Sequence, residues 1–493
     1  MHRSTGRERE QVPGRAIRLA FAGVSPQRTF PLARGLEEAG FTVFWVLKWR
    51  SEAEWLRAQG IPEERFLDTS RISTRHEDRD RLAAELAELE AVPGAPRMRD
   101  LMLMDRHLGR CGWDFALRYL GHLNRVVPAF LRDREVEIVS TLPDTALQIL
   151  SLWTARRLGI PAVVPTPLRF PALRFGFCPS HESAEFVPVR EVQAEDYAAA
   201  QAVVDEFRAG RMLVVSPRTV RDVTSITRML PRQIRYFSQV AAWARHDAGE
   251  RHHRWTLADL LRMYLGKRMA LVRTRLRLDF QSRIGTRPFV LYAVHVQPES
   301  SIDVYGAFFS NQEELVRHIA RSTPATHDLY VKIHLANTGE QATAFYDRLR
   351  RIPGVVVIGP GVPVRELLER CSIVFTVSGT MAYEAGLLGK HAVTFGRMFF
   401  DRLPTVHHCD APPELPALVS RILAEPERDR TPEIVEAVAE LHAASFPGEF
   451  TTRGGGKVFG PDDVRWLGEA YRALHRYTRG GVAAEGARVA AEG

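Results

Sequence analysis

The sequence predicts an α/β protein built on parallel βα units, and three observations support this fold class. Apolar runs of strand length alternate with segments of helical period over residues 17–164, and the same alternation returns over residues 289–396. The apolar runs of the second region are continuous rather than alternating, which is typical of parallel strands covered on both faces. At 493 residues the chain is also too long for one hydrophobic core, so two such domains are expected.

The composition is that of an ordinary soluble protein, with 45% hydrophobic and 26% charged residues. No apolar run of about 18 residues occurs, and the charged N-terminal residues lack the apolar core of a secretory signal. The four cysteines have no CxxC spacing, which fits a reducing compartment. A cytoplasmic location is expected, with the inner face of the membrane as an alternative. The net charge of +8 favours an acidic partner or an anionic membrane, whereas no motif supports a nucleic-acid partner.

The first region opens with a βαβ unit. Residues 17–23 are expected to form a buried strand, followed by a helix that ends at Gly40 and by a second strand, FTVFWVL. The first βα loop has no GxGxxG pattern, so a dinucleotide-binding fingerprint is absent. Arg28 lies in this loop, where substrates are met in such folds, and is either a substrate-binding residue or a solvated loop arginine.

A second βαβ unit is expected from a strand at 136–142, a helix at 144–158 and a strand at 162–164. Asp144 stands at the turn before the helix, where it is either the helix N-cap or a catalytic residue, because strand-to-helix loops face the crevice. Arg169 follows the last of these strands and is either a site for an anionic substrate or a surface arginine.

Residues 178–287 have a helical pattern. One amphipathic segment carries Leu257, Leu261, Leu265, Val272 and Leu276 near one stripe, with Arg262, Arg273 and Arg277 largely off it. Such a segment either packs on its own domain with its arginines solvated, or lies on an anionic membrane surface.

The second region contains five apolar runs that predict strands, at Phe289–Val296, Leu329–His334, Val355–Ile358, Ile373–Val377 and Ala392–Phe395. Polar residues stand where three of these strands end: His295 and Gln297, Lys332 and His334, and Ser378, Gly379 and Thr380. Because ligands bind outside the carboxyl ends of the strands in such sheets, these residues are the candidate nucleotide site.

The segment SGTMAYEAGLLGK is the most specific of these patterns. Gly379 lets the backbone approach an anion, and a helix that begins directly after it offers free N–H groups and a favourable dipole to a phosphate. Glu384 lies four residues after Thr380 on the same helical face, where it could accept ribose hydroxyls. The alternative is that Ser378 or Thr380 only caps the helix and Glu384 is solvated.

Lys332 and His334 are two residues apart on one strand, so they share a face, and two cations there suit a diphosphate or phosphodiester. His295 is a candidate base or phosphate donor; each histidine can equally be a hydrogen-bonded residue of the sheet. The run VHHCD invites a zinc hypothesis, but its adjacent residues point different ways and no second pair has metal-ligand spacing. No metal site is therefore predicted.

The motifs HVQPESS, YGAFFSNQEELVRHIA, LYVKIHLA and SGTMAYEAGLLGKHAVTFG resemble the capsule polysaccharide biosynthesis family, which includes the Kdo (3-deoxy-manno-octulosonate) transferases. The resemblance covers about residues 289–404. It implies a GT-B architecture, in which two Rossmann-like domains face each other across a cleft and the second holds the donor nucleotide without a metal or other cofactor.

The resemblance also implies roles for single residues. His334, Ser378 and Thr380 would contact the donor phosphate, as in transferases that use CMP-sugars. Leu335 stands where such motifs have proline, so UDP- and GDP-sugars stay open as donors. Gln297 and Glu299 of HVQPESS would bind substrate. The acidic EDG-type motif of the Kdo transferases is absent, so Asp144 is the substitute candidate for catalysis, with His295 as the other.

The leading hypothesis is a metal-independent glycosyltransferase that moves a sugar, Kdo or a related acidic sugar, from a nucleotide donor to a surface polysaccharide or glycolipid. The alternatives are a nucleotide-sugar epimerase or hydrolase, and an inactive carbohydrate- or membrane-binding scaffold. The expected divisions are a disordered tail (1–14), a first Rossmann-like domain (15–177), a helical segment (178–287), a nucleotide-sugar domain (288–425), C-terminal helices (426–479) and a second tail (480–493).

Overall fold

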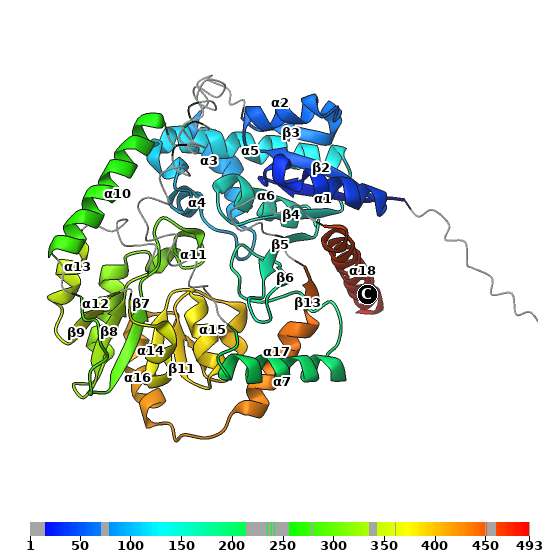
Figure 1. The fold of residues 1–493 in the computed structure, drawn as a ribbon. Coiled ribbons are helices and arrows are strands. Elements are labelled where there is room, and N and C mark those ends of the chain that lie inside the picture. The colour runs from blue at the N-terminus through cyan, green and yellow to red at the C-terminus, as the bar shows by residue number, and fades with distance from the viewer. Residues whose placement is uncertain are drawn as a thin grey trace, which may run out of the picture.

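A computed structural model describes residues 15–70, 78–212, 256–277, 280–334, 343–359, 361–448 and 460–492, together with positions 234, 238, 241 and 450. Within these residues the chain forms two α/β domains, each organised around one sheet (Figure 1). The predicted fold class, a GT-B-like arrangement of two Rossmann-like sheets, is confirmed.

The sheet of the first domain has the strand order β13-β6-β5-β4-β1-β2-β3. Its strands are β1 (Ile17–Ala22), β2 (Phe41–Leu47), β3 (Phe66–Asp68), β4 (Ile138–Thr141), β5 (Ala162–Pro167), β6 (Arg174–Cys178) and β13 (Ser445–Pro447). The pairs from β3 to β5 are parallel, whereas β6 and β13 add antiparallel pairs. The chain order reverses between β1 and β4, and ligands bind at such a reversal in open α/β sheets.

The sheet of the second domain repeats this plan, with the order β12-β11-β10-β7-β8-β9 and parallel pairs throughout. Its strands are β7 (Phe289–Ala293), β8 (Asp328–Lys332), β9 (Val355–Ile358), β10 (Ile373–Thr376), β11 (His391–Thr394) and β12 (Val406–His408). The order reverses between β7 and β10. By position, β1, β2 and β4 of the first sheet therefore correspond to β7, β8 and β10 of the second.

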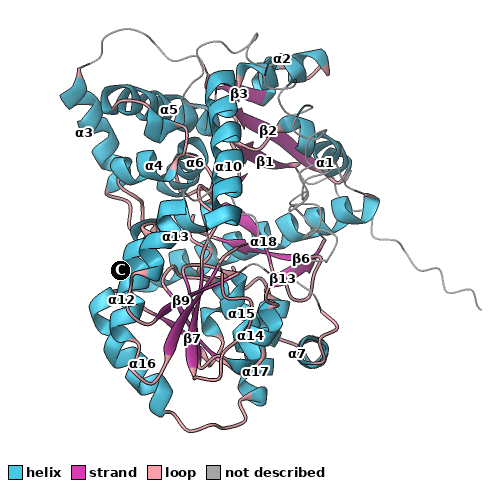
Figure 2. Ribbon diagram, turned by 60° about the vertical axis from the view of Figure 1, so that its left-hand side comes forward, coloured by secondary structure: helices cyan, strands magenta, loops and turns pink. Residues whose placement is uncertain are grey.

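Helices cover both faces of each sheet (Figure 2). Those of the first domain are α1 (Pro26–Glu38), α2 (Arg50–Ala58), α3 (Arg79–Glu90), α4 (Met98–Met104), α5 (Trp113–Asp133) and α6 (Ala146–Arg157). Those around the second sheet are α11 (Ser300–Asp303), α12 (Gln312–Ser322), α13 (Thr343–Arg350), α14 (Val364–Arg370), α15 (Thr380–Leu387), α16 (Leu415–Ala424) and α17 (Thr431–Ala443). The central strands are fully buried, as their continuous apolarity predicts.

The C-terminal segment returns to the first domain. β13 joins the edge of the first sheet, and α18 (Pro461–Glu492) packs beside α1 (Figure 1). The Tyr471 hydroxyl on α18 lies 2.7 Å from Ser140 Oγ on β4, inside an apolar cluster. This return fixes the last helix to the domain in which the chain begins.

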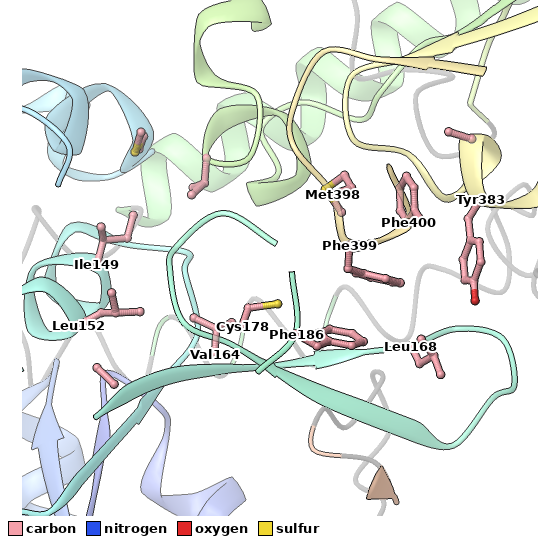
Figure 3. Packing of buried hydrophobic residues seen from close by; sticks show 14 of the residues in the cluster. Ile149, Leu152, Val164, Leu168, Cys178, Phe186, Tyr383, Met398, Phe399 and Phe400 are labelled. Carbon is pink, nitrogen blue, oxygen red and sulfur yellow. The ribbon is translucent and has the colours of Figure 1, made fainter. Parts of the chain in front are cut away.

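Aromatic side chains of the two domains pack against each other (Figure 3). Phe186 stacks on Phe399, with ring centroids 4.6 Å apart. Tyr383 of α15 packs edge-on against Phe170, and its hydroxyl donates a 3.1 Å hydrogen bond to the Phe170 carbonyl. One continuous core therefore runs from the first sheet into the second domain.

Two further helices lie outside this plan. α7 (Ala194–Arg208) packs against α17, and α10 (Leu257–Arg277) runs along the flank of both domains (Figure 1). α10 contacts α13 of the second domain and is tied to the first by the ion pair Arg110–Asp259. Among the described residues, no helix is both long and apolar enough to span a membrane.

Candidate functional site

The carboxyl ends of the two sheets meet at Asp144. Its carboxylate accepts hydrogen bonds from Arg106 of its own domain and from the Ser300 hydroxyl of the second domain. Thr145, not Asp144, is the N-cap residue of α6, so the N-cap alternative for Asp144 is wrong. The sequence motif HVQPESS thus lies directly against the candidate catalytic carboxylate, a contact that neither segment reveals alone.

A group of charged side chains surrounds Asp144 on the first-domain side. Asp105 is fully buried and accepts from the amides of His107, Leu108 and Ala146 at 2.8, 3.0 and 2.9 Å, which fixes the loop after α4 to the start of α6. Burial, with Lys48 and Arg106 nearby, lowers the pKa of His107 to about 3. Motif reasoning identified none of these residues except Asp144.

His295 organises the loop that follows β10. Its Nε2 accepts a 3.1 Å hydrogen bond from the Val377 amide and lies 2.9 Å from Thr376 Oγ1. Gln312 brackets the backbone of His295, accepting from its amide at 2.7 Å and donating to its carbonyl at 3.1 Å. Burial lowers the pKa of His295 to about 4, and His334 adds to this effect. This geometry is that of a neutral imidazole that holds the loop in place. It does not favour a role for His295 as a catalytic base.

The loop Ser378–Thr380 lies where the sequence analysis places the donor phosphate. The Ser378 hydroxyl donates to the Ser301 carbonyl, and the Gly379 amide donates to Thr376 Oγ1 at 3.1 Å. A Cβ at Gly379 would lie 2.5 Å from Thr376 Oγ1, so the packing beneath the loop already requires glycine. α15 begins at Thr380, and the positive end of its helix dipole would favour an anion there.

Glu384 is buried rather than solvated. It is 9% exposed, and burial raises its pKa to about 7, opposed by its hydrogen bond with Thr380 and by Arg365. The carboxyl group is thus held against the first turn of α15, beneath the predicted phosphate position.

Lys332 and His334 differ in burial. Lys332 is 5% exposed and donates to the carbonyls of Gly359 and Val362 at 2.6 and 2.8 Å. Burial lowers its pKa to about 8. His334 is exposed at the end of β8. The lysine therefore holds the loop between β9 and α14, and His334 is the more accessible of the predicted pair.

The predicted substrate residues are divided between the two domains. Gln297 donates to Asp303 Oδ1 at 3.0 Å, and Glu299 is the exposed N-cap residue of α11, accepting from the Ser301 hydroxyl at 3.1 Å. Both lie next to Ser300 and hence near Asp144. Arg28 is exposed in the first turn of α1, and Arg169 is partly buried in the loop between β5 and β6, with a φ of 75°.

A cavity of about 730 Å³ opens between the domains at the carboxyl ends of β11 and β12. Residues 94–97 and Met104 line it from the first domain, and residues 304–309 and 395–397 from the second. None of the predicted catalytic, donor-binding or substrate-binding residues lines this cavity, although residues of the YGAFFSNQEELVRHIA motif do. The ring of Phe308 in its wall is 90% exposed, a side chain able to stack on a flat apolar ligand face.

One group of side chains among the described residues has metal-ligand spacing: His391, His407 and Glu425. His391 Nδ1 lies 3.2 Å from His407 Nε2, and Glu425 is also paired with Arg430. His391 is the first residue of β11, at the edge opposite to Asp144, and the charges of Arg421 and Arg430 reach His407. Two adjacent guanidinium groups disfavour a divalent cation, so the geometry fits a hydrogen-bonded pair. Metal independence stays a prediction.

Comparison with known proteins gives one family match. Residues 234–403 match the model described as capsule polysaccharide biosynthesis protein. Over this region the chain is therefore similar to the capsule polysaccharide biosynthesis family. This region holds β7 to β11 and the loops at their ends, and so includes every predicted donor-site residue.

Matches to solved structures are distant. The KpsC β-Kdo 2,4 transferase of Thermosulfurimonas dismutans is 13% identical with a TM-score of 0.30, over 63% of this chain and 81% of that chain. The UDP-GlcNAc 2-epimerase of Methanocaldococcus jannaschii is 12% identical with a TM-score of 0.26, over 87% and 98%. A glycosyltransferase of Rickettsia africae is 10% identical with a TM-score of 0.28, over 87% and 93%. The search of curated proteins returned no match.

Proposed function

We propose that this protein is a metal-independent GT-B glycosyltransferase of capsule-type polysaccharide synthesis. It moves Kdo or a related acidic sugar from a nucleotide donor to a polysaccharide or glycolipid acceptor at the cytoplasmic side of the membrane. A CMP-sugar is the favoured donor, with UDP- and GDP-sugars as alternatives, and no other cofactor takes part. The observation that carries the proposal is the contact of Asp144, from the first strand edge, with Ser300 of the family motif.

The role proposed for each residue follows from the sheet edge at which it lies. His334 and the start of α15 at Thr380 stabilise negative charge on the departing nucleotide, and preorganised donors of this kind contribute on the order of 3 kcal/mol each. Asp144 takes the proton of the acceptor hydroxyl as that oxygen attacks the sugar. Arg106 and Ser300 orient its carboxylate through their hydrogen bonds. His295 and Lys332 act by holding the loops that carry the contacting groups.

The test separates chemistry from donor binding. Asp144→Asn keeps the size of the side chain and removes the base, so we expect turnover to fall about 100-fold or more while nucleotide affinity stays within about twofold. Turnover is measured with a CMP-, UDP- or GDP-sugar, and affinity by calorimetry with the free nucleotides. The matched control is Asp114→Asn on α5, where the carboxylate is exposed. Full turnover in Asp144→Asn would contradict the assignment.

The same assay distinguishes the alternatives. An epimerase or hydrolase converts the nucleotide sugar without an acceptor, and an inactive scaffold binds none of the three nucleotides. Product analysis with and without the acceptor therefore decides between transfer and the other two functions.

A peripheral membrane contact through α10 belongs to this proposal. Leu257, Leu261, Leu265 and Met269 recur every fourth residue and are 38–57% exposed, while Leu260 is buried on the other side. The sequence of α10 is strongly basic, with Asp259 as its one acidic residue. An apolar stripe on a basic helix suits an anionic bilayer surface.

The contact is tested by sedimentation with vesicles. Wild-type protein should bind phosphatidylglycerol vesicles and not phosphatidylcholine vesicles, and Leu261→Glu with Leu265→Glu should abolish this binding. Leu103→Glu, which places the same charge at a site that is 77% exposed on α4, should bind as wild type does. Equal binding of all variants would remove α10 from the proposal.

A further inference from the structure

Lys48 is a buried ammonium at the substrate edge of the first domain. It directly follows β2, at the carboxyl end of the strand, and its side chain is 6% exposed. Its Nζ lies over the Trp49 ring, 5.7 Å from the centroid. Burial lowers the pKa of Lys48, whereas Asp105, Asp144 and Glu52 raise it in that order of effect. The residue thus belongs electrostatically to the group around Asp144.

No hydrogen bond or ion pair from the Lys48 ammonium to a described residue exists, although three carboxylates are near. Each carboxylate is engaged elsewhere. Asp105 accepts three backbone amides, and Asp144 accepts from Arg106 and Ser300. Glu52 accepts from the amides of Lys48 and Trp49 at 3.2 and 3.3 Å. The three N–H donors of the Lys48 ammonium therefore have no acceptor among the described protein atoms and can bind a ligand.

Such an arrangement is unfavourable unless a ligand uses it, because a buried ammonium without acceptors loses hydration and gains no hydrogen bond. Lysine is also scarce in this chain, with five in all: Lys48, Lys267, Lys332, Lys390 and Lys457. Lys332 stands at the end of β8, which corresponds to β2, and there two carbonyls satisfy the ammonium. The two lysines therefore differ in partners and not in position.

The charge balance indicates the chemical class of the ligand. Lys48 and Arg106 contribute two positive charges, and Asp105, Asp144 and Glu52 contribute three negative charges. A carboxylate or phosphate brought to Lys48 would meet this negative excess. A sugar hydroxyl has no charge, accepts from an ammonium and donates to a carboxylate at the same time. The surroundings of Lys48 thus suit a neutral polyhydroxyl group.

We propose that Lys48 binds the glycan acceptor, donating hydrogen bonds to sugar hydroxyls that lie between it and Asp144. The inference rests on the proposed transferase function and adds that the acceptor presents a neutral, hydroxyl-bearing sugar to the first domain. Lys48 is then a substrate-binding residue whose specificity is for hydroxyl groups.

The five lysines make a direct test practicable. Protein labelled with ¹³C and ¹⁵N only at lysine gives one side-chain methylene signal set per residue, and Lys48→Arg assigns that of Lys48 by its absence. We expect neutral mono- and disaccharides to shift the Lys48 signal in a saturable way. The signal of Lys390, which is partly exposed just before β11 in the second domain, should not change. Inorganic phosphate and uronic acids should act more weakly. A shift only with anions, or with none of these probes, overturns the proposal.

A binding measurement completes the test. Lys48→Met should raise the dissociation constant for the saccharide with the largest shift about tenfold or more, because a charged donor to the ligand is lost. Nucleotide affinity should stay within about twofold, and Lys390→Met should change neither. Unchanged saccharide affinity in Lys48→Met contradicts the role of Lys48. If the wild type binds none of the nucleotides, the transferase function is contradicted instead. Failure of the Lys48 proposal and failure of the proposed function are therefore distinguishable.

Discussion

The two strand edges that face each other carry similar residues in different states. At the second edge, His295, Lys332, Ser378 and Gly379 all have protein partners within the domain. At the first edge, the Lys48 ammonium has no hydrogen-bond or ion-pair partner among the described residues, and Asp144 accepts a hydrogen bond from Ser300 of the other domain. The loops of the second edge are thus held in place by hydrogen bonds within the domain. At the first edge, the N–H donors of Lys48 can bind a substrate.

This difference separates residues that build a site from residues that contact a ligand. Lys48 directly follows β2 and Lys332 is the last residue of β8, so both stand at the carboxyl end of a buried strand. Only the positions of acceptor atoms distinguish them, because a satisfied ammonium stabilises the fold and an unsatisfied one destabilises it. Substitutions at the two edges should therefore have opposite effects on stability.

The largest expected effect concerns His295 at the second edge. Its pKa of about 4 in the folded protein lies below the ordinary value of 6.5. Above pH 6.5 both folded and unfolded chains hold it neutral, and as pH falls from 6.5 to 4 only the unfolded chain gains the proton. The folded state therefore loses about 3 kcal/mol through this residue over that window.

The measurement is the free energy of unfolding by urea at pH 7 and at pH 4.5. The loss on acidification should be smaller in His295→Gln than in the wild type by about 2–3 kcal/mol. His318→Gln, at a partly exposed position on α12, should show the same loss as the wild type. An identical loss in His295→Gln would mean that the imidazole is not buried in its neutral form.

Lys332→Met should lower the free energy of unfolding by about 2 kcal/mol, because the carbonyls of Gly359 and Val362 would lose a charged donor in a buried loop. Lys390→Met, at a partly exposed position, should change it by less than about 0.5 kcal/mol. Equal values for the two variants in urea unfolding would show that solvent replaces the lysine and that the second edge is less rigid than proposed.

Sequence reasoning placed the sheet edge and most of the loop residues because parallel strands bring their ends together by geometry alone. Continuous apolar runs were sufficient to predict β7 to β11, and the Gly379 loop followed from its strand-to-helix position. The sequence could not show that Gly379 is required by Thr376 and not by a ligand. That requirement arises because the Thr376 side chain, three residues earlier, lies where a Cβ at position 379 would be.

The first edge was less predictable for a different reason. Lys48, Asp105, Arg106 and Asp144 come from three separated loops, and no short motif links them. The one available signal was compositional: lysine at a strand end in a chain that otherwise uses arginine. The return of α18 to the first domain was also hidden, because an amphipathic helix pattern says which face is buried and not which surface covers it.

The smallest effect gives the sharpest contrast. Lys48→Met removes a buried charge that has no acceptor among the described residues, and it leaves an apolar chain of similar length beside Trp49. The free energy of unfolding should therefore stay the same or rise by up to about 1 kcal/mol. A variant that is as stable as the wild type but binds saccharide weakly has lost a ligand contact and not a structural one. If Lys48→Met instead loses as much stability as Lys332→Met in the same urea experiment, the ammonium has an acceptor within the protein, and the distinction between the two edges fails.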